Sequence, residues 1–553
     1  MKSRMKKLLS MGLVLSMVLA LAGCQNEKEQ NVANEGTESA VGSSTVATES
    51  NTVATESTEV DLYEATEYPE SVTVFSSKGA SKIKEGEKDY NASTSFRLME
   101  EMTGTHIEWN LQDDFDQKFQ LMIAGGEYDD VIVANLAKYG GAEKFVEDGV
   151  IINLMDYQEY MPNFIEFTKN NPEIAKSYLS SEGEILYLPF IRFDRELCVF
   201  QGPLMRMDWL EKLDLEVPTN PETLYNVLLA FKNQDPNGNG QADEIPMSGK
   251  STITQSFGMF DTSTSFYLKD GKVMYGPMTE NYDEALTYFA KLYHEGLIDE
   301  EYMMITGSQL TGKVTNHQVG FYWNYQPTTL ADTMREVDPN FKMLGIPWFE
   351  NSEGVSVTSY QPYIQQVVPS WCAAISTQCE NPEEVLKWLD SFYSEEATEY
   401  MNYGEKGVTY NMVDGKYVYS DYITNNPDHT LSEMTNLEIG SIGGRFPQFQ
   451  RWEAYAQTIS QEGAESILSW MGADTSMCLP SLSFTAEENQ SISNIMAQIN
   501  TIVDEKLHKI IMGQEKLEVM EEVRSQITKL GIEDVIAIYQ AAYDRYNNNT
   551  FAE

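Results

Sequence analysis

Ser71-Val-Thr-Val-Phe75 opens a stretch in which strand-like and helix-like runs take turns. This first run alternates polar and apolar residues, as a half-buried strand does. Helical spacing follows at 95–102 and 115–123, and strand-like runs follow at His106-Ile-Glu-Trp-Asn110 and Asp130-Val-Ile-Val-Ala134. Strands separated by helices of this length predict parallel sheet units, so we expect an α/β protein.

The same kind of pattern continues over a long body. From Pro69 to Glu553 the chain has about 485 residues, which is too many for one hydrophobic core and predicts two lobes, or one lobe with large insertions. Further helices are predicted at Glu222–Lys232, Asp283–Glu295, Pro382–Tyr400, Glu487–Leu507 and Val535–Tyr546.

The amino-terminal residues have the features of an export signal. Four basic residues precede Leu8–Leu21, an apolar run of 14 residues that is too short to span a bilayer comfortably. The sequence Leu21-Ala-Gly-Cys24 that follows resembles a bacterial lipobox. The resemblance implies that residues 1–23 are removed and that Cys24 carries the lipid of a mature lipoprotein. The alternative is an ordinary secretory signal with an incidental cysteine.

Residues 24–68 are expected to be a disordered tether. They are rich in Glu, Ser, Thr, Asn and Val, contain the repeat Thr45-Val-Ala-Thr-Glu-Ser50 and Thr52-Val-Ala-Thr-Glu-Ser57, and after Cys24 have no Trp, Phe or Cys. Such a composition cannot bury enough surface to offset its chain entropy. A flexible coil of this length would span roughly 35–40 Å, which would let the folded body stand off a membrane.

The charge of the chain excludes some partners. Without the signal the chain has 34 Lys and Arg against 85 Asp and Glu, a net charge of −51. Such a surface repels nucleic acid and anionic lipid headgroups, so any membrane contact is expected through the lipid alone. Four cysteines remain in the body, and for Cys372 and Cys379, which are seven residues apart, a disulfide and buried free thiols are equal alternatives.

Several short segments carry a resemblance to a known family. Met205-Arg-Met-Asp-Trp-Leu-Glu-Lys-Leu213 followed by Val217-Pro-Thr219 is similar to the Arg-x-Asp-Trp-Leu segment of extracellular solute-binding proteins of ABC importers, in the lipoprotein branch that binds oligosaccharides. Other matching segments occur in the expected order: Thr103-Gly104, Gly125-Gly-Glu-Tyr-Asp-Asp130, Asp235-Pro-Asn-Gly-Asn-Gly240, Leu292-Tyr-His-Glu-Gly-Leu297, Asn381-Pro-Glu-Glu384 and Ala541-Ala-Tyr-Asp-Arg-Tyr546.

The resemblance implies a type II periplasmic-binding-protein fold, in which two α/β lobes joined by a hinge close on a ligand. We expect one lobe from residues 69–188 plus 365–466, and the other from 189–364 plus 467–553. The implied protein is a monomeric receptor, not an enzyme, on the extracellular face of the cell membrane. It would capture a saccharide and deliver it to the permease subunits of an ABC transporter.

The loop from Asp235 to Glu244 is the best candidate for a metal site. Oxygen-bearing side chains recur at loop positions 1, 3, 5 and 9, Gly240 occupies the turn at position 6, and position 7 needs only the Gln241 carbonyl. Position 12 is Pro246, so the usual glutamate is missing, and the resemblance suggests Glu244 in its place. We therefore predict one structural Ca²⁺, against the alternative of a metal-free turn. The predicted ligands are Asp235, Asn237, Asn239, Gln241, Asp243 and Glu244.

Aromatic residues suggest the ligand site, because sugars present flat apolar faces edged by hydroxyls. In Gly320–Gln326, Phe321, Trp323 and Tyr325 would share one strand face, and Trp323 with Asn324 and Gln326 combines a platform with polar groups. The other candidates lie at the expected lobe crossings or end a matching segment: Phe190, Arg192, Trp348, Trp371, Trp470 and Asp130. Trp209 and Trp388 sit in helical apolar stripes and are assigned to cores.

Two other classes of function use the same features. A glycoside hydrolase needs only two suitably spaced carboxylates, which 85 acidic residues can supply. A surface adhesin would also use a lipid anchor and a spacer. The sequence has no His-Glu-x-x-His motif, no Gly-x-Ser-x-Gly elbow and no phosphate loop, and the resemblance over the whole body favours a binding protein.

Overall fold

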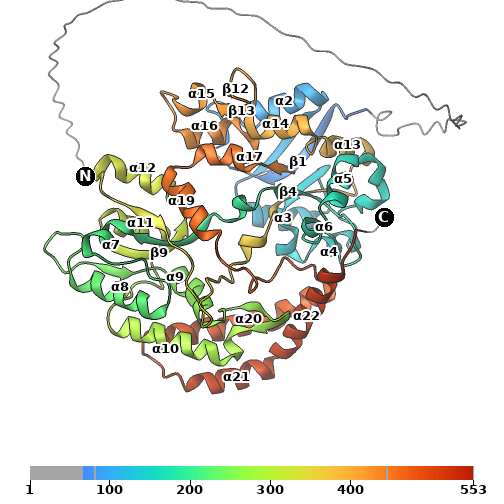
Figure 1. Ribbon diagram of the computed structural model, residues 1–553. Helices are drawn as coiled ribbons and strands as arrows, with labels where there is room; N and C mark the ends of the chain where they lie inside the picture. The colour runs from blue at the N-terminus through green and yellow to red at the C-terminus, as the bar shows by residue number, and fades with distance from the viewer. Residues whose placement is uncertain (1–66, 80–81, 444–445, 552–553) are drawn as a thin grey trace, which may run out of the picture. The chain divides into compact units, whose positions relative to one another are not determined.

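The computed structural model describes residues 67–79, 82–443 and 446–551. The predicted signal, Cys24 and most of the predicted tether lie outside these residues. The described chain alternates helices and strands around two main sheets (Figure 1). Of the helices in these ranges, none is long and apolar enough to cross a membrane.

The first sheet contains the strands that the opening sequence stretch predicts. Its order is β14-β4-β11-β3-β1-β2, and β1 pairs in parallel with both β2 and β3, as expected. Strand β11 runs antiparallel between β3 and β4, a placement that sequence periodicity does not predict. The strands are β1 (Ser71–Ser77), β2 (His106–Gln112), β3 (Val131–Ala134), β4 (Leu188–Arg192), β11 (Val367–Ile375) and β14 (Gln448–Gln450).

The second sheet has the order β10-β5-β9-β6. Its strands are β5 (Gln201–Arg206), β6 (Ile245–Met247), β9 (Val319–Tyr325) and β10 (Met343–Gly345). Strand β9 is parallel to β6 and antiparallel to β5. Two hairpins lie outside the sheets, β7 (Phe266–Lys269) with β8 (Lys272–Tyr275) and β12 (Tyr410–Val413) with β13 (Lys416–Tyr419).

Helices accompany both sheets. Those nearest in sequence to the first sheet are α2 (Thr94–Thr103), α3 (Phe115–Gly125), α4 (Ala142–Glu147), α5 (Pro162–Asn170), α6 (Pro172–Ala175), α13 (Pro382–Ser391) and α14 (Glu395–Tyr403). Those nearest to the second are α7 (Met207–Leu213), α8 (Pro221–Asn233), α9 (Lys250–Gln255), α10 (Glu280–His294), α11 (Gly307–Thr315) and α12 (Thr328–Val337). The carboxyl-terminal helices are α19 (Gln461–Trp470), α20 (Ala486–Ile511), α21 (Val519–Leu530) and α22 (Ile532–Asn548).

One predicted helix is wrong in its length. The sequence predicts a single helix over Pro382–Tyr400, whereas the chain forms α13 and α14 with a break between them. The break has a local cause, because Ser394 is extended and its hydroxyl accepts a hydrogen bond from the Ala397 N–H at 3.1 Å. Because Ser394 caps the start of α14, α13 and α14 are separate helices, and the apolar stripe of α13 does not continue into α14.

Two large hydrophobic cores accompany the two sheets. One includes strands β1, β3 and β4 together with α13, and Trp388 lies in it with 1% of its surface exposed. The other joins α8 and α10 to the carboxyl-terminal helices, and contains Trp209, also 1% exposed. Both tryptophans are therefore core residues, as their helical spacing predicts. The separate cores are compatible with the two expected lobes.

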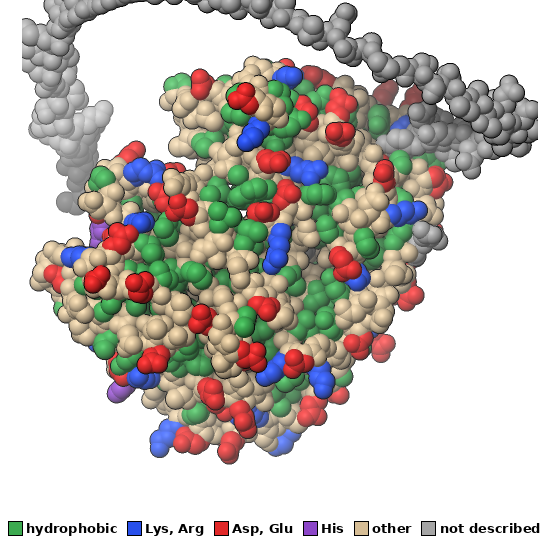
Figure 2. Space-filling model, viewed as in Figure 1, with side chains coloured by type: hydrophobic (Ala, Val, Ile, Leu, Met, Phe, Trp, Pro, Cys, Tyr) green, Lys and Arg blue, Asp and Glu red, His purple; other side chains and the backbone are tan. Residues whose placement is uncertain are grey.

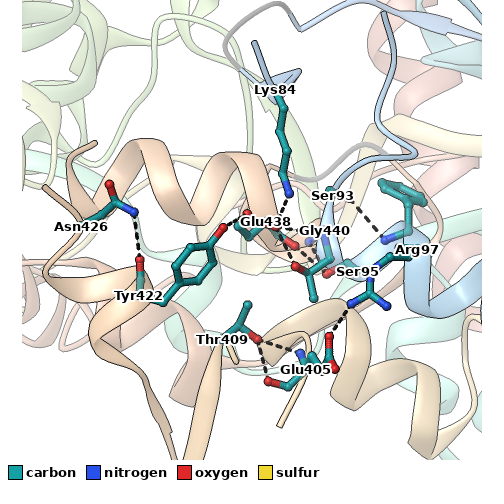
Figure 3. Close-up of polar contacts among 12 residues, drawn as sticks. Lys84, Ser93, Ser95, Arg97, Glu405, Thr409, Tyr422, Asn426, Glu438 and Gly440 are labelled. Atoms are coloured by element: carbon teal, nitrogen blue, oxygen red, sulfur yellow. Dashed lines mark hydrogen bonds and ion pairs between the residues drawn. The ribbon is translucent and has the colours of Figure 1, made fainter. Parts of the chain in front are cut away.

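An extension formed by β12, β13, α15 (Asp421–Thr424), α16 (Leu431–Glu438) and α17 (Gly440–Gly443) packs against α2 (Figure 1). The buried Glu438 carboxylate joins the two parts: one oxygen accepts from the Thr94 N–H at 3.1 Å and hydroxyl at 2.7 Å, and the other from the Tyr422 hydroxyl at 2.6 Å. Lys84 Nζ completes the site at 2.8 Å (Figure 3). This carboxylate is satisfied within the fold, so we assign it a structural role.

The cysteines of the body are free thiols. Cys198, Cys372 and Cys478 are buried, and Cys379 is partly buried. Cys372 lies within β11, where its thiol donates to the Val368 carbonyl oxygen. Of the two alternatives for Cys372 and Cys379, the structure contains the free thiols.

The buried His508 predicts acid sensitivity. Burial lowers its pKa to about 4, while Nδ1 lies 2.9 Å from the Tyr302 hydroxyl oxygen. Below pH about 6.5 the His508 imidazole takes up a proton in the unfolded chain but stays neutral in the folded chain. The free energy of unfolding should therefore fall between pH 6.5 and 4 by up to about 3 kcal/mol. Urea unfolding should show a weaker fall for His508→Gln. Equal slopes for wild type and His508→Gln would contradict this assignment.

Candidate functional site

The carboxyl ends of strands locate the candidate site. Strands β3 and β4 are both antiparallel to β11, so their last residues, Ala134 and Arg192, lie on the same edge of the first sheet. In the second sheet β9 ends at Tyr325, which pairs with Gln201 at the start of β5. Residues 193–200 connect the two edges directly. Ligands of α/β proteins commonly bind beyond such carboxyl edges.

Side chains from several connections meet at this place, and we call them the crossing cluster. Its members are Arg192, Phe200, Trp323, Tyr325, Gln326, Tyr360 and Tyr455. Tyr360 belongs to the connection between β10 and β11, and Tyr455 ends α18 (Trp452–Tyr455). Three separate passages of the chain between the sheets therefore contribute.

One side of the crossing cluster is a stack that reaches solvent. The Arg192 guanidinium carbon lies 4.5 Å from the centre of the Phe200 ring. Phe200 in turn stacks on Tyr325, with ring centres 5.8 Å apart and planes 26° from parallel. Tyr325 is 60% exposed. Burial lowers the pKa of the Arg192 guanidinium, which nevertheless stays charged at neutral pH.

The other side of the crossing cluster contains Trp323. Its ring meets Tyr360 edge-on, with ring centres 5.1 Å apart, and the Tyr360 hydroxyl donates to Gln201 Oε1 at 2.5 Å. The Trp323 indole nitrogen is buried and has no hydrogen-bond partner among the described residues. A buried N–H without an acceptor is costly, so a ligand oxygen that reached this donor after a movement of the neighbouring side chains would remove that cost.

The structure brings together part of the predicted ligand set. Arg192, Trp323 and Gln326 are members of the crossing cluster. Asn324 is half-buried next to them, and its Oδ1 accepts from the Tyr325 N–H at 2.8 Å.

Figure 2 shows hydrophobic side chains gathered towards the middle of the visible face, with acidic side chains scattered over it.

Trp470 is not a member of the crossing cluster and is reassigned to the core. It is fully buried, and its indole N–H donates to the Pro203 carbonyl oxygen at 3.1 Å. Gly202 and Gly345 allow the ring to approach, since an added Cβ would lie 2.4 Å and 2.7 Å from its atoms. A ring with no exposed surface cannot act as a platform for a sugar.

Phe190 and Trp348 are also core residues, with 1% and 3% of their surfaces exposed. The Trp348 indole N–H is already satisfied, because it donates to the Tyr363 hydroxyl oxygen at 3.1 Å. Trp371 is half-buried and meets Phe190 edge-on at 5.7 Å. These contacts give Phe190 and Trp348 a packing role, while a ligand role for Trp371 stays a prediction.

Asp130 lies at the amino end of β3, whereas the crossing cluster lies at the carboxyl edge of the same sheet. It precedes β3, and its Oδ2 accepts from the Thr73 N–H at 2.9 Å and hydroxyl at 2.7 Å. The carboxylate thus joins β1 to β3. Its ligand role remains a prediction without support from these contacts.

Four members of the crossing cluster are not among the residues that the sequence predicts. Tyr325 could have been found, because it shares the alternating strand with Trp323. Phe200, Tyr360 and Tyr455 lie in or next to irregular connections, where no periodicity marks a functional side chain. Their proximity depends on how the connections cross, which is a property of the fold.

The predicted calcium loop is tightly turned around its first residue. Asp235 has a φ of 48°, and its carboxylate oxygens accept from the N–H groups of Gly238 at 2.9 Å and Gly240 at 3.1 Å. Asp243 Oδ1 accepts from the side-chain amides of Asn237 and Asn239, both at 3.0 Å. These residues therefore converge on one small volume.

The donor set of this loop fits a hard cation. Glu244 Oε1 is buried without a partner among the described residues, and burial followed by the charges of Asp235 and Asp243 raises the pKa of its carboxyl. In the part of the chain that the structure describes, no group of three or more His, Cys, Asp or Glu side chains is placed to hold a metal ion. A cation here would rely on Asn oxygens and a backbone carbonyl as well, which Ca²⁺ accepts.

A family model of bacterial extracellular solute-binding proteins matches residues 76–399, more than half of the chain. The chain belongs to this family. The resemblance that the sequence segments indicated is therefore confirmed. Because the family consists of solute-binding proteins, the expectation that the chain is not an enzyme is confirmed too.

Two curated relatives extend the comparison. The fructooligosaccharide ABC transporter substrate-binding protein FusA of Streptococcus pneumoniae is 26% identical over 493 residues, which cover 84% of this chain and 88% of FusA. Lipoprotein LipO of Bacillus subtilis is 26% identical over 346 residues, which cover 60% of this chain and 66% of LipO.

Solved structures confirm the two-lobed α/β fold of the solute-binding proteins. A human-milk-oligosaccharide (HMO) binding solute-binding protein of Bifidobacterium longum infantis aligns with a TM-score of 0.70 and 23% identity, over 86% of this chain and 99% of that one. An EF-hand mutant of FusA in complex with fructo-nystose aligns with a TM-score of 0.67 and 23% identity, over 87% of this chain and 100% of that one.

Proposed function

We propose that this protein captures a saccharide between two lobes, without altering it, and delivers it to the permease subunits of an ABC importer. The proposed lobes are residues 69–188 plus 365–466 and residues 189–364 plus 467–553. The separation of the two sheets and the presence of two large cores support this division into lobes. Each lobe contributes strands whose carboxyl ends carry the crossing cluster.

The observation that carries the proposal is the chemistry of the crossing cluster. An exposed Tyr325 ring stacked on Phe200 offers a face to the apolar side of a sugar. The unpartnered Trp323 indole N–H and the Arg192 guanidinium offer donors to its oxygens. Aromatic faces with a few oriented polar groups are typical of small-ligand sites. The names of FusA and of the HMO-binding protein support a saccharide in particular.

A thermal-shift screen over mono- and oligosaccharides, followed by calorimetry and analysis of the recovered carbohydrate, tests the proposal. A binding protein should be stabilised by its ligand and return it unchanged. Shortened products would instead indicate a glycoside hydrolase. Stabilisation by peptides alone would reject the saccharide assignment.

We also propose a monomer anchored by lipid at Cys24, on the extracellular face of the membrane. The lipobox-like sequence Leu21-Ala-Gly-Cys24 supports the anchor, and LipO is a relative whose name describes a lipoprotein. Two or more acyl chains on Cys24 would make the attachment stable, whereas a single chain is marginal.

One structural Ca²⁺ is proposed in the loop from Asp235 to Glu244. EDTA should lower the melting temperature and added Ca²⁺ should restore it, because a cation present at about 100 times its dissociation constant stabilises the folded state by about 2.7 kcal/mol. The EF-hand mutant of FusA supports a loop of this kind in a relative. Differential scanning calorimetry makes the measurement.

The matched control for this prediction is a second aspartate at positive φ. Asp235→Asn should abolish the response to EDTA, whereas Asp270→Asn should keep it, since Asp270 has a φ of 51° in an exposed hairpin turn. A wild-type melting temperature that does not change on chelation would reject the calcium site.

A further inference from the structure

Arg192, at the carboxyl edge of the first sheet, has no ionic partner in the part of the chain that the structure describes. It is half-buried at the end of β4, and among the described residues no Asp or Glu oxygen lies within ion-pair distance of its guanidinium. Its contact is with the Phe200 ring, 4.5 Å away. A cation removed from water without an anion is costly, so this arrangement requires an explanation.

The neighbours of Arg192 do not supply the missing charge. Its neighbours include the Cys198 thiol and the hydroxyls of Tyr455 and Tyr360, and burial raises the pKa of all three, so they are uncharged at pH 7. The nearby Asp194 is engaged elsewhere, because its Oδ2 accepts from the Trp452 N–H at 2.7 Å. An anion at this place therefore has to come with the ligand.

We propose that Arg192 pairs with a carboxylate of the ligand, so that the bound saccharide belongs to the uronic-acid-containing oligosaccharides. This inference rests on the proposed function of the crossing cluster. Closure of the lobes over a neutral sugar would remove further water from an uncompensated cation. Closure over a uronate instead creates a charge-assisted pair that the planar guanidinium can make with two parallel hydrogen bonds.

The acidic surface of the protein does not prevent such a ligand from binding. At physiological salt the Debye length is about 8 Å, so most of the net charge of −51 is screened from the site. A partly desolvated pair between Arg192 and a carboxylate is screened much less. The global charge would slow the association more than it would weaken the final contact.

Calorimetry with oligogalacturonides and their carboxyl-reduced counterparts tests the inference, since each pair differs only in the carboxylate. Oligomers of glucuronate, mannuronate and guluronate extend the panel. Wild-type protein should bind the acidic member of at least one pair about tenfold more tightly than its neutral counterpart, or 1.4 kcal/mol. Arg192→Gln should remove this preference, and Arg192→Lys should restore it only in part.

A neighbouring arginine provides the control. Arg195 is exposed, so Arg195→Gln makes the same change in net charge and should keep the preference for the acidic member. Unchanged melting temperatures of the free variants would exclude misfolding as the cause. Equal or tighter binding of the neutral member by wild-type protein would overturn the inference and leave the proposed function intact. Absence of binding to any saccharide would remove both.

Discussion

Replacing Trp470 with alanine is expected to lower the free energy of unfolding by about 3–5 kcal/mol, the range typical of a fully buried aromatic residue. The ring lies at the end of α19 against Gly202 and Gly345, so its removal leaves a cavity that two strands line. The Pro203 carbonyl oxygen also loses its donor. Urea unfolding monitored by circular dichroism measures the effect.

Leu468 is the control on the same helix. It is 64% exposed, so Leu468→Ala should change the free energy of unfolding by no more than about 0.5 kcal/mol. If Trp470→Ala instead kept its stability and lost its affinity for the ligand, the reassignment of Trp470 to the core would be wrong and the sequence-based interpretation would return.

Replacing Trp323 or Tyr325 with alanine is expected to weaken saccharide binding about tenfold each, or 1.4 kcal/mol, and about a hundredfold together if they contact different sugar units. Tyr325 would lose an exposed stacking face, and Trp323 would lose both a ring and an indole N–H without a partner. Calorimetry with the saccharide that the screen identifies makes the measurement.

Trp323→Phe separates the two contributions of the indole. It keeps an aromatic face and removes the N–H, so its affinity should lie between those of wild type and Trp323→Ala. Met304→Ala is a surface control, since Met304 is 80% exposed and lies outside the crossing cluster. A large loss of stability in Trp323→Ala, with the affinity of the folded protein unchanged, would instead assign Trp323 to the core.

Local sequence patterns predicted the elements of the fold better than their arrangement. The segments from Ser71 to Ala134 form strands and helices close to their expected bounds, because alternation and helical spacing act over a few residues. The antiparallel strand β11 returns from a distant part of the chain and pairs with β3 and β4. Only the resemblance to a family, not periodicity, indicated that the chain crosses between two lobes.

The candidate site was predicted only in part for a related reason. The strand-like run around Trp323 and the position of Arg192 at an expected lobe crossing made these two residues candidates, and the structure places both in the crossing cluster. Trp470, Trp348 and Phe190 were misjudged, since a tryptophan or phenylalanine near a crossing looks the same in sequence whether its ring faces a ligand or a core. Burial depends on the neighbours that tertiary packing supplies.

Small-angle X-ray scattering of the purified protein with and without its saccharide, with mass spectrometry of the recovered carbohydrate, tests most directly whether two lobes close on an unaltered ligand. We expect a smaller radius of gyration at saturating saccharide and a carbohydrate of unchanged mass. Superimposable scattering curves together with shortened carbohydrate products would contradict it.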